Sequence, residues 1–146
     1  QENLNRYWID TANKTGYVDT IPDIEINPKR GYPLQCSRAA GGNISPTIPL
    51  NYHTQGTACW VIFRAMVKVH EYIQELNRNK PNELKWNMVM QVHDELVIDF
   101  PIRKGYQYHL KSIKNLMESC GDSIGVPLKV GCEIHDDNWS QGRSME

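Results

Sequence analysis

The chain has 146 residues, enough to bury one hydrophobic core, and is expected to form one domain or part of a larger one. Its 40% hydrophobic and 23% charged residues are typical of an ordinary globular protein. The net charge of −1 excludes a general attraction to nucleic acid, so DNA binding would need local clusters of positive charge. Apolar runs are all shorter than the roughly 20 residues of a membrane span, and we expect no membrane partner.

Cysteine spacing and the first residues indicate the setting of the chain. The four cysteines lie far apart, a pattern that favours neither a zinc site nor a disulfide scaffold and is typical of a reducing compartment. The chain starts at Gln1 without an initiator Met or a secretion signal, and its first residues have helical spacing. We therefore expect a fragment of a longer protein.

The first third of the chain predicts a helix, a strand and a long connection. Apolar residues within residues 4–8 predict the end of a helix that finishes before Gly16. The alternation in Tyr17–Ile21 predicts a short strand. Residues 22–49 are rich in Pro, Gly, Ser and Asn, which favours an extended loop or a loose hairpin.

A long amphipathic helix is the clearest element. Apolar residues repeat every three or four positions from about Tyr52 to Arg78, which predicts one helix with a single apolar stripe. Asn79 and Pro81 are expected to end it. Asn51, just before the stripe, is a candidate N-cap residue.

The remaining chain predicts a hairpin, a second helix and a last strand. Trp86–Val92 and Leu96–Phe100 read as an antiparallel pair with His93-Asp94-Glu95 at its tip. Residues 106–124 predict an amphipathic helix, and Leu128–Ile134 a final strand. The expected class is α+β, an antiparallel sheet with helices packed on one side.

Four separated segments, in order, resemble the DNA polymerase I family (family A). Met90–Val97, Met-Gln-Val-His-Asp-Glu-Leu-Val, is similar to motif C of the family's palm. Gly16–Thr20 resembles the segment after the fingers helices, and Asn51–Val69 resembles the long helix beside the bound duplex. Val126–Leu128, followed by Asn138-Trp139, resembles the C-terminal strand and tail.

This resemblance implies a fold and a function. The antiparallel sheet would belong to the palm of the right-hand polymerase architecture, with residues 1–50 as the end of the fingers and a connecting loop, and residues 51–146 as the C-terminal half of the palm. The implied activity is template-directed DNA synthesis. Its partners would be primer–template DNA, dNTPs and the missing N-terminal part of the polymerase, in the cytoplasm of a bacterial cell or a phage-infected host. A divergent phage or prophage enzyme would fit.

The carboxylates of the hairpin are the candidate catalytic and metal-binding residues. Exposed acids at the end of a hairpin can hold a hard cation such as Mg²⁺ against a phosphate. The resemblance implies that Asp94 bridges two Mg²⁺ ions, that Glu95 is a nearby second carboxylate, and that His93 lies near the primer terminus. Outside this context, the same residues would be an ordinary solvated turn.

Candidate DNA-binding residues lie on the long helix and around it. Asn51 and Gln55 are one helical turn apart, and the resemblance implies that their amides face the minor groove, where every base pair presents acceptors. Gln91 is two residues before His93, so the period of two would place both on one strand face. Further candidates, in a loop that is otherwise simply solvated, are Lys29, Arg30 and Arg38.

The sequence also departs from the family. Thr47 stands where the family usually has an Arg that contacts the primer, and residues 22–46 lack a clear match to its Arg-rich hairpin. The second metal-binding Asp (motif A) and the helix that binds the incoming nucleotide (motif B) are expected before residue 1. We therefore expect the isolated chain to be inactive.

Two other functions remain open from the sequence. The chain could be a non-catalytic module that holds primer–template DNA, for example half of a split polymerase. It could also be a metal-dependent nuclease or phosphatase built on Asp94 and Glu95. That function would need further carboxylates nearby, and the candidates are Asp19, Asp99 and Asp136.

Overall fold

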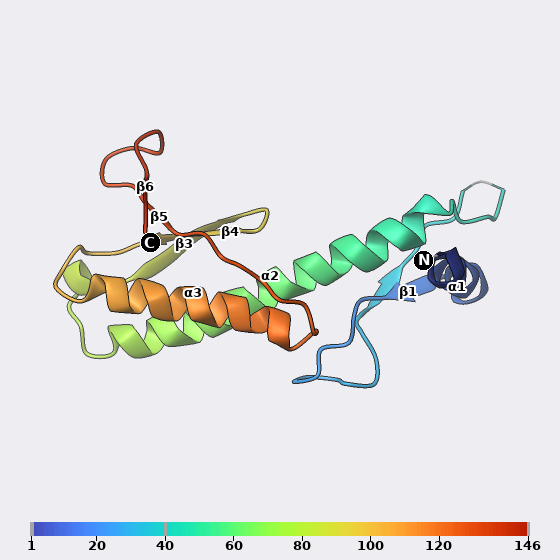
Figure 1. Ribbon diagram of the computed structural model, residues 1–146, viewed down its shortest axis with the longest axis horizontal. Coiled ribbons are helices and arrows are strands. Elements are labelled where there is room, and N and C mark those ends of the chain that lie inside the picture. Colours follow the sequence, from blue (N-terminus) through green and yellow to red (C-terminus); the bar gives the residue numbers. More distant parts are fainter. Residues whose placement is uncertain (1, 40, 146) are drawn as a thin grey trace. The chain divides into compact units, whose positions relative to one another are not determined.

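The computed structural model describes residues 2–39 and 41–145 and divides the chain into two compact units, residues 1–61 and 62–146. The class is α+β, as expected, with helices and short antiparallel sheets (Figure 1). The elements are α1 (Glu2–Thr15), β1 (Tyr17–Asp19), β2 (Pro33–Gln35), α2 (Thr47–Asn77), the 3₁₀ turn η1 (Asn82–Leu84), β3 (Asn87–Val92), β4 (Glu95–Asp99), α3 (Tyr106–Asp122), β5 (Glu133–Ile134) and β6 (Arg143–Ser144).

The first unit is built around a loose hairpin, as predicted. α1 ends before Gly16, whose φ of 79° lies in the left-handed region and lets the chain turn into β1. β1 pairs antiparallel with β2, and Val18 lies opposite Leu34. Four buried hydrophobic residues of this unit form one cluster: Ala12, Val18, Cys36 and Ile44. The small core thus joins α1, the hairpin and the segment that leads into α2.

Helix α2 begins earlier than predicted. It starts at Thr47 instead of Tyr52, and Pro49 is tolerated because backbone N–H groups in a first turn have no intrahelical partner to lose. Asn51 therefore lies in the second turn, and the expectation that it caps the helix is wrong. The C-terminal end is close to the prediction: α2 stops at Asn77, and Asn79 has a φ of 60°.

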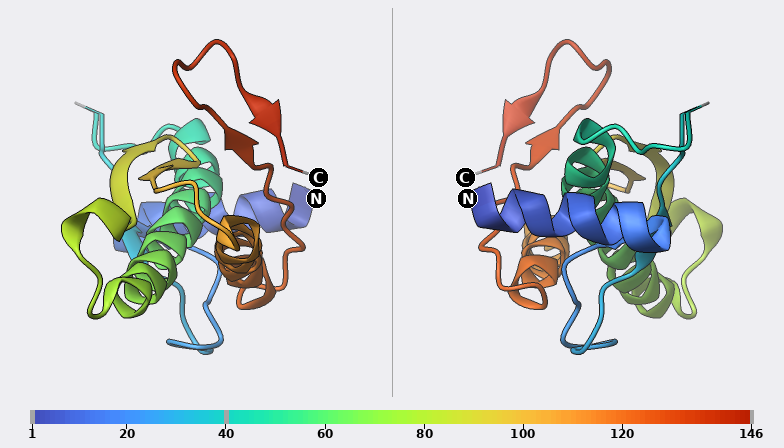
Figure 2. Two further views of the ribbon diagram at one scale, coloured as in Figure 1. Left: turned by 90° about the vertical axis from the view of Figure 1, so that its left-hand side faces the viewer. Right: turned by 90° about the vertical axis from the view of Figure 1, so that its right-hand side faces the viewer.

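The second unit packs the β3–β4 hairpin against two helices. The part of α2 in this unit runs antiparallel to α3, since Lys68 Nζ donates to Ser119 Oγ at 3.3 Å and Tyr72 Oη lies 2.8 Å from His109 Nδ1 (Figure 2). The buried cluster of this unit consists of Val69, Ile73, Trp86, Leu110, Ile113 and Ile134. Met88, Leu96 and Ile98, from one face of the hairpin, pack on this cluster. Helices therefore cover that face.

The prediction of a final strand over Leu128–Ile134 is largely wrong. Only Glu133–Ile134 is extended and paired, and its partner is β6 in the C-terminal tail. The preceding residues follow the end of α3 instead: Val126 N donates to Gly121 O at 2.9 Å, and Val130 N donates to Glu118 Oε1 at 3.0 Å. The described strands form three separate two-stranded sheets and not the one sheet that was expected. No helix in the described ranges is long and apolar enough to cross a membrane.

Candidate active site

The turn of the β3–β4 hairpin exposes Asp94. Val92 pairs with Glu95, so the turn consists of His93 and Asp94. His93 has a φ of 53°, in the left-handed region that a tight hairpin turn requires. The Gln91 side-chain amide donates to the His93 carbonyl and so stabilises the turn. Asp94 and Glu95 are both exposed, but Glu95 is the first residue of β4 and not part of the tip, which corrects the expectation of two acids there.

A β-bulge changes which residues share a face of the hairpin. The register shifts between Met88 and Met90, so Val89 has no partner. Gln91 then lies opposite Leu96, whose side chain packs against the core. Directly opposed residues share a face, so Gln91 is on the packed side and half-buried. The expected alternation with His93 does not hold, because His93 lies outside the strand.

The carboxylate pair has the chemistry of a magnesium ligand set. Mg²⁺ prefers oxygen ligands and usually takes one or two protein carboxylates, with water and phosphate oxygens completing its octahedron. Asp94 and Glu95 offer adjacent, solvent-accessible carboxylates, which fit that requirement. Within residues 2–39 and 41–145 no group of three or more His, Cys, Asp or Glu side chains is placed to hold a metal ion.

The carboxylates named for a nuclease site have other surroundings. Asp19 is bound to Arg30, and Asp136 is bound to Arg143 by two bonds of 3.3 Å. Asp136 also raises the pKa of Arg143, after the larger effect of the hydrogen bond to the Tyr106 hydroxyl. Asp99 pairs with Asn87 at the other end of β4. The described contacts of Asp19 and Asp136 are thus with arginines, which gives the nuclease hypothesis no support.

The two amides of α2 lie in the first unit. Asn51 and Gln55 are both exposed, one turn apart on the same helical face. Both side chains are therefore free of the core and available to a ligand. Asn51 and Gln55 thus lie together in the first unit, whereas Asp94 and Glu95 lie together in the second.

Two of the three loop cations have protein partners. Arg30 makes a bidentate pair with Asp19, at 3.0 and 3.2 Å, and this hydrogen-bonded charge raises the pKa of Arg30. Arg38 donates to the carbonyls of Gly42 and Asn13, each at 2.9 Å, and so ties the loop to α1. Lys29 is exposed. The arginines thus have structural contacts in addition to their predicted role at DNA.

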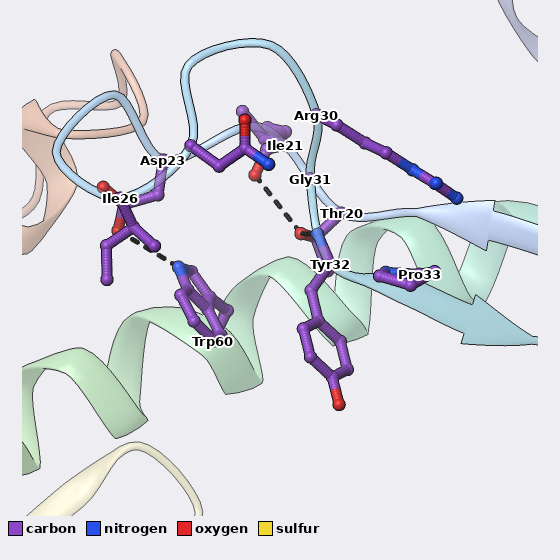
Figure 3. A pocket seen from close by; sticks show the side chains of 10 residues that line it. Thr20, Ile21, Asp23, Ile26, Arg30, Gly31, Tyr32, Pro33 and Trp60 are labelled. Carbon is purple, nitrogen blue, oxygen red and sulfur yellow. Dashed lines mark hydrogen bonds between the residues drawn. The ribbon is translucent and has the colours of Figure 1, made fainter.

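A pocket in the first unit was not foreseen. The loop after β1 and one face of α2 enclose about 330 Å³, with Asp23 and Trp60 in its wall (Figure 3). Asp23 is only 4% exposed and accepts hydrogen bonds from Trp60 Nε1 at 3.1 Å and from Glu25 N at 2.9 Å. The Tyr32 and Trp60 rings lie nearly parallel, 5.8 Å apart. The only sequence signal was an Asp in a loop, where its side chain commonly bonds the backbone two residues on.

Comparison with known proteins identifies the family. The fold and the turn define an α+β protein with an exposed carboxylate pair on a β-hairpin. Residues 3–141 match the family model of DNA polymerase family A, and the chain belongs to that family. The resemblance inferred from the four segments is thereby confirmed.

The relatives are much longer than this chain. DNA polymerase I of Chloroflexus aurantiacus is 30% identical over 135 residues, which are 91% of this chain and 13% of the relative. The thermostable DNA polymerase I of Thermus aquaticus is 29% identical over 143 residues, 90% of this chain and 15% of the relative. DNA polymerase I of Caldicellulosiruptor bescii is 29% identical over 136 residues, 92% and 13% respectively. The chain therefore spans about one seventh of the curated relatives it matches.

Proposed function

We propose that the chain is the C-terminal part of a DNA-dependent DNA polymerase that extends a primer with dNTPs. Residues 1–50 would be the end of the fingers with a connecting loop, and residues 51–146 the C-terminal half of the palm. The observation that carries this proposal is the exposed Asp94 at a hairpin turn, within a motif C sequence, in a chain of family A. Primer–template DNA, dNTPs and the N-terminal part of the polymerase are the proposed partners.

Asp94 and Glu95 are the proposed ligands of Mg²⁺. Two bound Mg²⁺ ions would lower the pKa of the primer 3′-hydroxyl and neutralise charge on the leaving pyrophosphate. Asp94 suits a bridging position because its side chain is short and its backbone is fixed by the turn. Glu95 is held by its pairing with Val92, which keeps a second carboxylate beside the first. His93, in the same turn, is proposed to lie near the primer terminus.

The exposed amides of α2 are proposed to contact the duplex. Asn51 and Gln55 can donate to minor-groove acceptors that every base pair presents, so they would test base-pair shape without reading the sequence. Lys29, Arg30 and Arg38 are proposed to contact the phosphate backbone. Gln91 is proposed to act at the hairpin turn, where its amide donates to the His93 carbonyl.

The metal-ligand proposal is tested by replacing Asp94 in the complete polymerase. Asp94→Asn removes the charge but keeps the shape, and the primer-extension rate should fall on the order of a thousandfold, with primer–template affinity nearly unchanged. Asp99→Asn is the matched control, since Asp99 is an exposed carboxylate at the end of β4 that is far from the turn. A near-normal rate for the Asp94 variant would overturn the assignment.

The isolated 146 residues are proposed not to polymerise. Residues 1–146 contain one matched catalytic segment, and the second metal-binding Asp and the nucleotide-binding helix are expected upstream of Gln1. Purified chain should give no template-dependent extension with dNTPs and Mg²⁺. Extension above that of an Asp94→Asn chain prepared in parallel would contradict this proposal.

A further inference from the structure

Three side chains on one face of α2 bind the end of β1 and the segment that follows it. The contacts occur at intervals of four and three residues on the helix, and of two residues on the segment from Asp19 to Asp23. The helix residues His53, Thr57 and Trp60 pair in order with Asp19, Ile21 and Asp23. We call these three contacts the ladder.

The geometry of the two elements explains this regular pairing. Seven helical residues rise about 10.5 Å. Four extended residues span about 13 Å, with alternate groups on the same side. The two lengths are similar, so the segment can follow the helix and make a contact at each turn. The ladder thus fixes the loop along α2 and also fixes the rotation of α2 about its own axis.

The first two contacts involve buried or half-buried polar groups with defined donors. His53 Nδ1 lies 2.5 Å from Asp19 O, and since a carbonyl oxygen only accepts, Nδ1 carries the proton. Thr57 Oγ1 accepts from Ile21 N at 3.0 Å and donates to His53 O at 2.6 Å. The contacts therefore join into one network.

Ring stacking on His53 and the ion pair between Arg30 and Asp19 strengthen the network. The Trp8 ring of α1 stacks on the His53 ring with centroids 4.1 Å apart. At the other end, Trp60 Nε1 binds the buried Asp23 carboxylate, while Arg30 extends away from that contact toward Asp19 (Figure 3). His53 is thus held both in the plane of its ring, by hydrogen bonding, and on its face.

Asn51 and Gln55 occupy the opposite side of the same helical turns. Each precedes a ladder residue, His53 or Thr57, by two positions, which corresponds to a rotation of roughly 200° about the helix axis. Both amides are exposed, whereas Thr57 is buried. A rotation of α2 that broke the ladder would turn these amides by the same angle.

We propose that His53 is a positioning residue for recognition of the primer–template minor groove. By binding Asp19 O, it sets the direction of the Gln55 amide, and the acceptors of a correctly paired duplex meet that amide while those of a mispair do not. This inference rests on the proposed function, in which Gln55 contacts the minor groove. His53 itself touches no substrate in this mechanism.

A double-mutant cycle in the complete polymerase tests the coupling between His53 and Gln55. The measured quantity is the ratio of kcat/KM for matched over mispaired primer termini. His53→Leu removes the donor, and Gln55→Ala removes the amide; each should lower the ratio about fivefold. The double variant should fall no further, because both changes remove the same contact. His53→Asn, which returns an N–H at the position of Nδ1, should restore most of the ratio.

Each outcome of the cycle decides the matter. A normal ratio for Gln55→Ala overturns the proposed minor-groove contact and this inference with it. A reduced ratio for Gln55→Ala with a normal one for His53→Leu overturns the inference alone, and so does a double variant whose loss is the product of the single losses. If His53→Leu prevents folding, Thr57→Val takes its place in the cycle, with the same expected loss of the ratio and the same lack of further loss in the double variant.

Discussion

Asn77 joins the end of α2 to the start of the hairpin, and its removal should destabilise the second unit. Its Oδ1 accepts from Trp86 N at 2.8 Å, and its Nδ2 donates to Trp86 O at 2.7 Å. Trp86 is 3% exposed, so Asn77→Ala would leave two backbone groups in a largely buried place without partners. A buried group left without a hydrogen bond costs about 1–3 kcal/mol.

The expected loss lies near the lower end of that range for each group. Asn77 is half-buried, and water can enter part of the space that its side chain leaves. We therefore expect the free energy of unfolding to fall by about 2–3 kcal/mol. For a chain of this size that corresponds to a decrease in Tm of roughly 4–12 °C.

The assay is urea unfolding of the 146-residue chain followed by circular dichroism, with hydrogen exchange on β3 and β4. Asn82→Ala is the matched control, because the Asn82 side chain is exposed and its hydrogen bond is to the solvent-accessible Lys85 ammonium. The control should change stability by less than about 0.5 kcal/mol. Equal effects of the two substitutions would refute the argument that the Trp86 backbone depends on Asn77.

Three further predictions concern other parts of the chain. Gly31→Ala should destabilise the first unit by about 1–3 kcal/mol, because the new Cβ would lie 1.8 Å from Thr20 O; Gly41→Ala, whose Cβ meets nothing within 4 Å, should be nearly neutral in the same thermal unfolding series. Burial lowers the pKa of His109, so the unfolded state binds the proton more readily and stability should decrease as the pH falls below about 6.5; His109→Gln should flatten this pH dependence. The outer face of β3 carries exposed apolar side chains, so the isolated chain should self-associate, and a monodisperse monomer by light scattering would contradict this expectation.

Local patterns predicted the elements whose stabilising contacts are regular in sequence. The apolar stripe of α2, the helix of α3 and the Met-Gln-Val-His-Asp-Glu-Leu-Val hairpin were all found close to their predicted places. The largest error concerns the segment before β5. The segment before β5 did not become a strand because the Glu118 carboxylate and the Gly121 carbonyl bind its N–H groups.

The candidate site shows the same division. The sequence alone indicated Asp94 as an exposed residue of a turn, and this is where the structure has it. It did not predict that Glu95 would start a strand, because the loop length of a hairpin depends on its register. It also did not predict the bulge at Val89, which places Gln91 on the packed face.

By itself, the sequence determined the family, the α+β class and the location of the carboxylate turn, since periodicity and short motifs are properties of neighbouring residues. Only the tertiary structure decided the partners of Arg30 and His53 and brought Trp60 to Asp23. Asp23 and His53 bind groups 34 or more residues away in the chain, and no local pattern specifies which of many polar groups will meet. Burial determines these partners, because a polar group removed from water is stable only when it forms a hydrogen bond within the fold.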